Sequence, residues 1–294
     1  MTNKFAIYTA IVGNYDEILQ PLVVDDRFDY ILFSNDMKKT SIGVWQVRGI
    51  DYENADKIKI ARWVKTHPDD LLHGYEFSLW IDANIQIKTN YIYHRVIELF
   101  GGGISVSTVV HPTMNCIYNE MFTVFDIGYE TEKTILDWAN VLRKNQYPFN
   151  NGLHETGILF RIHSYDMKKF NDLWWSCIEC YSRRDQLSFN YALWKLGIKC
   201  ESLLPKGQSC TFPQTCPHFN YKSHFNYKRK YYDRNTDCSL LRRYYLDLPN
   251  SKKEIENIYY KIFRMPFPKF WAYIYGQIYR IKFHWNRVKI NRGR

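Results

Sequence analysis

The stretch Ser78-Leu79-Trp80-Ile81-Asp82-Ala83-Asn84-Ile85-Gln86-Ile87 is an apolar run that carries one acidic side chain near its middle. A carboxylate buried within a strand is costly unless a positive group meets it. At the carboxyl end of a strand in an α/β sheet, in contrast, Asp82 would project into the crevice where ligands bind. The run therefore predicts a strand that ends at a ligand site, and the alternative is an ordinary strand-end Asp that begins a turn.

The side chains of Asp82 and Asn84 point the same way if the strand continues, because successive side chains alternate between the two faces. Their oxygens can then reach one Mg²⁺ or Mn²⁺ ion, which usually completes its coordination with substrate phosphates. Asn84 is the weaker ligand of the two, because a neutral amide oxygen replaces a carboxylate. The pair predicts a metal-bound diphosphate of the kind found in enzymes that use nucleotide sugars.

Strands and helices alternate along most of the chain. We expect strands at 5–12, 30–34, 45–48, 78–82, 104–110, 157–162 and 198–204, and helices at 55–66, 90–100, 166–180 and 184–196, with two more helices between 116 and 145. This alternation predicts an α/β fold with a mostly parallel sheet covered on both faces. The pattern stops near Pro205.

The positive charge of the chain is concentrated at one end. Residues 251–294 hold 11 of the 40 Lys and Arg but 2 of the 30 Asp and Glu, so this tail carries +9 of the net charge of +10. We therefore expect a catalytic domain at 1–250 and a basic, aromatic, helical tail at 251–294. Within the tail, 268–285 is rich in Trp and Tyr, which favours attachment to an anionic membrane surface. A helix packed on the domain is the alternative, and nucleic-acid binding is disfavoured because the excess charge is confined to the tail.

The sequence opens without an apolar leader segment, contains no run of 18 uncharged apolar residues and has seven irregularly spaced cysteines. Cys177 and Cys180 fall inside an expected helix, and no second cysteine pair has the spacing of a zinc site. From these features we expect reduced thiols and a cytoplasmic protein, held peripherally on the inner face of the cell membrane by its tail.

A second candidate site is the segment Ser182-Arg183-Arg184-Asp185-Gln186-Leu187-Ser188-Phe189-Asn190. Ser182 is expected to cap a helix, which places Asp185 in the first turn, where the helix dipole favours a negative charge. The functional alternative is that Asp185 and Gln186 face the cleft and bind sugar hydroxyls, with Asn190 near the same face.

Two further groups of residues allow both a structural and a functional interpretation. Lys59, Arg62 and Lys65 recur every three residues and form either a solvated helix face or a contact for a diphosphate. His218 and His224 lie in an aromatic segment, where one of them could supply a nitrogen ligand to the metal or serve a structural role.

The region from Ala61 to Asn84 resembles the Arg…Pro…Tyr-Leu-Asp-x-Asp core of the glycogenin-like and lipooligosaccharide galactosyltransferase family. In that family an Asn-Tyr pair meets the uracil, similar to Asn14-Tyr15 here, and an Asp-Gln-Asp at a helix start is similar to Asp185-Gln186-Leu187, which lacks the second acid.

A closer resemblance is to the glycosyltransferase-like domain family of bacterial surface-polysaccharide loci and of plant proteins linked to pollen turgor and seed mucilage. The matching motifs are residues 8–16, 78–82, His111-Pro112, Glu155 with Arg161, and 183–186, whereas Phe33-Ser34-Asn35 departs from the family's Phe-Ser-Asp. This resemblance covers roughly residues 5–225.

The resemblance implies a GT-A type nucleotide-binding fold and a glycosyltransferase that moves a sugar from a nucleoside-diphosphate sugar, with UDP expected, to a glycan or lipid-linked acceptor in capsule or lipopolysaccharide synthesis. It implies Mn²⁺ or Mg²⁺ as the cofactor. The implied metal ligands are Asp82, Asn84 and His224; the implied donor-binding residues are Thr9, Ala10, Tyr15, Lys59, Arg62, Lys65 and Asp82; and the implied catalytic residues are Asp185, Glu155 and Gln186. A ceramidase-like hydrolase is the alternative activity, although the chain has neither a Gly-x-Ser-x-Gly nor a His-Glu-x-x-His motif.

Overall fold

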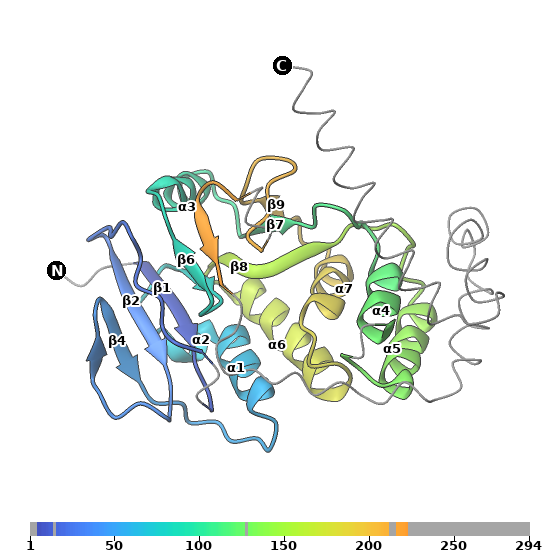
Figure 1. The fold of residues 1–294 in the computed structure, drawn as a ribbon. Coiled ribbons are helices and arrows are strands. Elements are labelled where there is room, and N and C mark those ends of the chain that lie inside the picture. The colour runs from blue at the N-terminus through green and yellow to red at the C-terminus, as the bar shows by residue number, and fades with distance from the viewer. Residues whose placement is uncertain (1–4, 14–15, 127–128, 212–215, 223–294) are drawn as a thin grey trace, which may run out of the picture. The chain divides into compact units, whose positions relative to one another are not determined.

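The computed structural model describes residues 5–13, 16–126, 129–211 and 216–222 (Figure 1). They all belong to a compact unit of residues 1–236, and the predicted tail at 251–294 lies outside the described residues. The strands are β1 (Phe5–Ala10), β2 (Phe28–Phe33), β3 (Ser41–Ile42), β4 (Trp45–Arg48), β5 (Phe77–Ile81), β6 (Ile85–Ile87), β7 (Val106–Val110), β8 (His154–Ile162), β9 (Glu201–Ser202) and β10 (Phe219–Tyr221). The helices are α1 (Lys57–Thr66), α2 (Pro68–Leu71), α3 (Tyr91–Gly101), α4 (Ile117–Asp126), α5 (Glu132–Lys144), α6 (Tyr165–Cys180) and α7 (Gln186–Leu196).

Eight strands form one mixed sheet in the order β3-β4-β2-β1-β5-β8-β7-β9. β4, β2, β1 and β5 run parallel, whereas β8 is antiparallel to both of its neighbours and β3 is antiparallel to β4. The predicted α/β fold with a mostly parallel sheet is therefore confirmed. A second, two-stranded sheet pairs β6 with β10 in antiparallel register.

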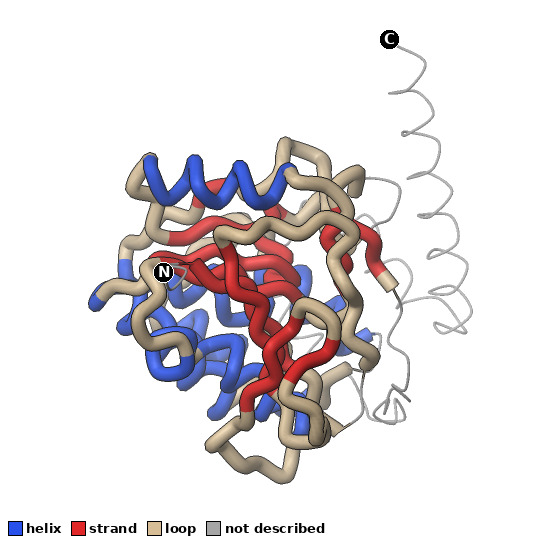
Figure 2. Tube along the Cα trace, turned by 90° about the vertical axis from the view of Figure 1, so that its left-hand side faces the viewer, coloured by secondary structure: helices blue, strands red, loops and turns tan. Residues whose placement is uncertain are grey.

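The alternation of side chains along the central strands builds a core on each face of the sheet. On one face, Ile7 and Leu79 pack with the apolar side of α3. On the other, Tyr8 and Trp80 pack with α1, α6 and α7, among them the fully buried Trp174. Figure 2 shows the resulting layers, with the sheet between α3 and the larger group of helices.

The structure also corrects several predicted elements. The first strand ends at Ala10 instead of residue 12, and the strand expected at 198–204 is reduced to the two residues of β9. β10 lies beyond Pro205, where no strand was predicted, because its backbone completes the edge of β6. Gly197 ends α7 with a φ of 64°, a conformation that glycine adopts without strain.

Cys177 and Cys180 lie within α6, as predicted. Within the described ranges, we find no helix with the length and apolar character needed to cross a bilayer.

Candidate functional site

Asp82 lies directly after β5, at the carboxyl end of a strand that pairs with β1. The chain passes from β1 to β2 on one side of the sheet and later returns to place β5 on the other side. Ligands in open α/β sheets bind at such a switch point, outside the carboxyl ends of the strands. The backbone N–H of Asp82 donates to the carbonyl of Gly157 at 2.8 Å, and a Cβ on Gly157 would lie 3.5 Å from Asp82 Oδ2. The tighter neighbour of that Cβ would be Ile85 Cδ1, at 3.0 Å.

The carboxylate of Asp82 is surrounded by donors and positive charges. Its Oδ1 accepts a 2.6 Å hydrogen bond from Trp80 Nε1 and lies 3.5 Å from Lys65 Nζ and 3.8 Å from Arg62 Nη1. Trp80 reaches Asp82 because residues two apart in a strand share a face. The side chain of Asp82 is still 30% exposed, so this carboxylate can meet a ligand.

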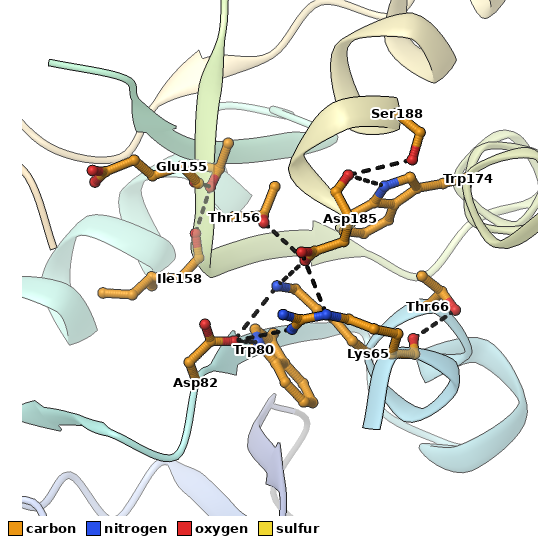
Figure 3. Close-up of polar contacts among 12 residues, drawn as sticks. Lys65, Thr66, Trp80, Asp82, Glu155, Thr156, Ile158, Trp174, Asp185 and Ser188 are labelled. Carbon is orange, nitrogen blue, oxygen red and sulfur yellow. Dashed lines mark hydrogen bonds and ion pairs between the residues drawn. The ribbon is translucent and has the colours of Figure 1, made fainter. Parts of the chain in front are cut away.

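Asp185 is the buried counterpart of Asp82, with 4% of its surface exposed. Its Oδ2 accepts hydrogen bonds from Lys65 Nζ at 2.5 Å and from Thr156 Oγ1 at 2.8 Å, and its Oδ1 lies 3.4 Å from Arg62 Nε (Figure 3). Burial alone would raise the pKa of Asp185, but the charges of Arg62 and Lys65 outweigh burial and hold that pKa well below its usual range. Asp185 is therefore a permanent anion.

The start of α7 differs from the sequence prediction. Asp185 itself occupies the N-cap position, but its side chain forms no capping hydrogen bond and turns instead toward Lys65. Ser182, the predicted cap, donates to Glu130 Oε1 at 2.7 Å. The prediction of Ser182 as the helix cap is wrong because the chain makes a further turn before the helix begins.

Lys65 is fully buried, which excludes the solvated-face interpretation for this residue. Its ammonium lies 5.4 Å from the centre of the Trp80 ring and 5.9 Å from that of Trp174. The backbone around it is fixed by Arg161, whose Nη2 donates to the Lys65 carbonyl at 2.6 Å. Lys59 is separate from this cluster, since its Nζ donates to the Glu179 carbonyl at 2.7 Å.

Asn84 is buried, and its amide is engaged by the segment that follows β10. Its Nδ2 donates to the Lys222 carbonyl at 3.0 Å, while the Lys222 N–H donates to the Asn84 carbonyl at 2.9 Å. His218 stacks on Tyr91 with ring centres 4.0 Å apart. Among the described residues, no group of three or more His, Cys, Asp or Glu is arranged to hold a metal ion. His224 and Tyr15 lie outside the described residues.

Glu155 is brought to the same end of the sheet but points away from Asp185 (Figure 3). Its carboxylate accepts hydrogen bonds from three neighbouring groups: Ser209 Oγ at 2.8 and 2.9 Å, Thr211 Oγ1 at 2.9 Å and the Cys210 N–H at 3.2 Å. Glu155 thereby anchors the segment 209–211 to β8.

The remaining candidates occupy varied positions. Gln186 is half-buried beside Asp185, whereas the Oδ1 of Asn190 accepts from the His154 N–H at 3.1 Å and so fixes the start of β8. Thr9 and Ala10 are buried at the end of β1 on opposite faces, and the Thr9 hydroxyl has no hydrogen-bond partner.

The sequence analysis did not predict the contacts of three residues that shape the site. Trp80 donates to Asp82, Thr156 donates to Asp185, and Arg161 donates to the backbone carbonyl of Lys65. For Trp80, the spacing of two residues from Asp82 was an available signal. Thr156 has no comparable signal, because its partner Asp185 is 29 residues away and the contact depends on the fold.

The site therefore consists of two carboxylates, Asp82 and Asp185, and two cations, Arg62 and Lys65, at the switch point of an α/β sheet. The chain matches the TOD1/MUCI70 family, a glycosyltransferase-like domain, over residues 1–220. The chain belongs to this family. TOD1/MUCI70 membership supports a glycosyltransferase and agrees with the family that the sequence motifs indicated.

Two other comparisons add little to this assignment. No curated protein matches the chain significantly. Among solved structures, the apo structure of the bifunctional glycosyltransferase WbbM is similar with a TM-score of 0.44 and 10% identity, over 70% of this chain and 39% of that one. The family assignment rests on the family match alone.

Proposed function

We propose that this TOD1/MUCI70 domain is a GT-A type glycosyltransferase that moves a sugar from a nucleoside-diphosphate sugar, with UDP as the expected nucleotide, to a glycan or lipid-linked acceptor of a surface polysaccharide. The observation that supports this proposal is the position of the Asp82 carboxylate, partly exposed at the switch point and next to two cations. We further propose that the tail at 261–294 holds the protein on the inner face of the cell membrane, near a lipid-linked acceptor.

The charges of the site divide into a buried and an exposed part. Asp185 and Lys65 form the buried pair, and Arg62, with a side chain that is 19% exposed, bridges both acids. A permanent carboxylate such as Asp185 can accept strong hydrogen bonds from sugar hydroxyls, but its low pKa makes it a poor proton acceptor. We assign Asp185, with Gln186 beside it, to orientation of the donor sugar.

We retain Mn²⁺ or Mg²⁺ as the expected cofactor, held by Asp82. Asp82 Oδ2 accepts no hydrogen bond from a described residue, and the side chain is 30% exposed, so the carboxylate fits one coordination position. Asn84 is a weaker candidate, because its amide oxygen is a neutral ligand and its side chain is buried, with Nδ2 bonded to the Lys222 carbonyl. When bound, the cation would supply Lewis-acid stabilisation of the charge on the leaving diphosphate.

Thermal shift against UDP, GDP, CDP and ADP, each with and without Mn²⁺, tests this proposal. A ligand at 100 times its dissociation constant stabilises the folded state by about 2.7 kcal/mol. We expect UDP with Mn²⁺ to raise the melting temperature of the wild type but not of Asp82→Asn. Asp166→Asn is the matched control, because the side chain of Asp166 is 82% exposed on α6. No stabilisation by any nucleotide would refute the proposal.

A further inference from the structure

Glu120, in the first turn of α4, is a buried acid without a hydrogen-bond or ion-pair partner among the described residues. It is 5% exposed, and in the part of the chain that the structure describes no hydrogen bond or ion pair reaches its carboxylate. The other buried acids of this region are all satisfied, since Asp185 is paired with Lys65, Glu155 is bonded to Ser209, and Glu130 accepts from Ser182. Buried carboxylates are normally paired, so an exception indicates a functional role.

The charged groups that face Glu120 are Arg184, which precedes α7, and Glu155 of β8. α4 packs against α7, so these groups approach Glu120 from two different elements. The Nε of Arg184 is buried without a hydrogen bond, and its guanidinium lies 5.2 Å from the ring centre of Tyr129. Glu120 and Arg184 are thus two opposite charges that form no direct ion pair among the described residues.

Arg184 connects Glu120 to the candidate site. It is adjacent in the chain to Asp185 and its charge acts on that carboxylate. The charge of Arg184 also lowers the pKa of the Tyr221 hydroxyl, whereas the charge of Asp82 raises it. The Tyr221 hydroxyl is hydrogen-bonded to the side chain of Asn84. α4 packs against α7, and Asp185 is the N-cap residue of α7, so Glu120 lies on the element next to the one that begins at this acid.

Glu120, Asp185 and Glu155 differ in how well each can accept a proton near neutral pH. Burial raises the pKa of Glu120 to about 7, while the charge of Arg184 limits the rise and that of Glu155 adds to it. A general base transfers protons best when its pKa lies near the working pH. Asp185 is held too acidic for this task, and the oxygens of Glu155 are already occupied by donors.

We propose that Glu120 is the general base that accepts the proton of the acceptor hydroxyl. This inference rests on the proposed glycosyl transfer. The hydroxyl oxygen forms a bond to the anomeric carbon of the donor sugar, and the bond from that carbon to the diphosphate oxygen breaks. The electron pair leaves with the nucleoside diphosphate, and the hydroxyl proton moves to the Glu120 carboxylate. Direct attack of this kind inverts the configuration at the anomeric carbon.

Release of UDP from UDP-glucose, UDP-galactose and UDP-N-acetylglucosamine, with water as the acceptor and Mn²⁺ present, tests the role of Glu120. Loss of a general base lowers the rate by about 10²–10⁴-fold. We expect this loss of kcat in Glu120→Gln, with UDP affinity unchanged within about twofold and with loss of the rise in rate with pH near neutrality. Sodium formate should restore part of the rate in Glu120→Ala. A Glu120→Gln enzyme with normal kcat and an unchanged pH profile would overturn the inference.

Glu130→Gln is the matched control. Burial also raises the pKa of Glu130, but its carboxylate accepts a hydrogen bond from Ser182, so we expect normal kcat and a normal pH profile. If Glu130→Gln loses as much kcat as Glu120→Gln, the effect belongs to buried acids in general and the inference fails.

A measurement without substrate separates this inference from the proposed function. Because the folded pKa of Glu120 is raised, the wild type loses stability as pH rises from the unfolded value toward 7. The melting temperature of Glu120→Gln should therefore increase relative to the wild type between pH 5 and pH 8. A constant difference over that range would contradict a titrating, unpaired Glu120. A wild type that neither binds UDP nor releases it from any of the three donors would refute the proposed function, and the inference with it.

Discussion

Replacement of Lys65 by Met should show how strongly the buried ion pair stabilises the fold. Lys65 is fully buried, with its Nζ 2.5 Å from Asp185 Oδ2 and 3.5 Å from Asp82 Oδ1. Methionine keeps most of the apolar stem and removes the charge. Removal of one partner from a buried pair typically costs about 3–5 kcal/mol, because the other charge is left without compensation. Asp185 keeps Arg62 and Thr156, so we expect a loss of about 3 kcal/mol, at the lower end of that range.

Equilibrium unfolding in urea at pH 7 measures this loss, and thermal unfolding should show a decrease of about 6–12 °C in the melting temperature. Asp185→Asn and the double variant complete a double-mutant cycle. The double variant should be less destabilised than the sum of the single variants, because neither residue then leaves a buried charge unpaired.

Lys133→Met provides the control, since the ion pair of Lys133 with Asp137 has the same 2.5 Å length but a lysine side chain that is 85% exposed. An exposed pair of this kind contributes about 0.3–0.5 kcal/mol. If Lys65→Met costs no more than Lys133→Met, or if the cycle shows no coupling, burial of the pair does not have the consequence that we infer.

Three further predictions concern ligand binding, pH and the membrane. Asp82→Ala should abolish Mn²⁺-dependent nucleotide binding, measured by calorimetry, with an unchanged circular dichroism spectrum; retained binding would remove Asp82 from the metal site. Burial lowers the pKa of His111 to about 4, and its Nδ1 accepts the Met114 N–H at 3.0 Å. Its contribution to stability is therefore present above the unfolded pKa of about 6.5 and lost as pH falls toward 4, so His111→Asn should lose less stability than the wild type between pH 7 and 5 in urea titrations. Deletion of 261–294 should release the protein from anionic vesicles in a sedimentation assay and preserve donor hydrolysis, whereas a full-length protein that ignores such vesicles would contradict the membrane role.

Much of the fold was accessible from the sequence because local patterns determine it. The alternation of apolar strands with amphipathic helices predicted α1, α3, α6 and α7 close to their observed bounds. Errors occurred where pairing with a distant strand decides the outcome. β10 is three residues long and exists because its backbone completes β6, more than 130 residues earlier, and no local pattern announces such a contact.

The candidate site was predictable only in part, for a similar reason. The position of Asp82 at a strand end follows from its own neighbours in the sequence. The partner of Lys65 does not, because Asp185 lies 120 residues further along the chain, and the basic spacing of α1 is equally typical of a solvated helix. Glu120 belongs to no motif, and the absence of a hydrogen-bond partner among the described residues can be recognised only when the surroundings of α4 are known.

The charge balance of the site explains why further positive charge would be needed for the proposed reaction. Lys65 and Arg62 already face Asp82 and Asp185, so these four side chains together are close to neutral. A diphosphate brings at least two negative charges, and a neutral cluster cannot compensate them. Asp82 is the acid with the longer ion-pair distances and the greater exposure, so it is the one whose charge is most available to a divalent cation. Arg184, which has no ion pair within the described structure and is adjacent to Asp185 in the chain, brings a further positive charge to this cluster.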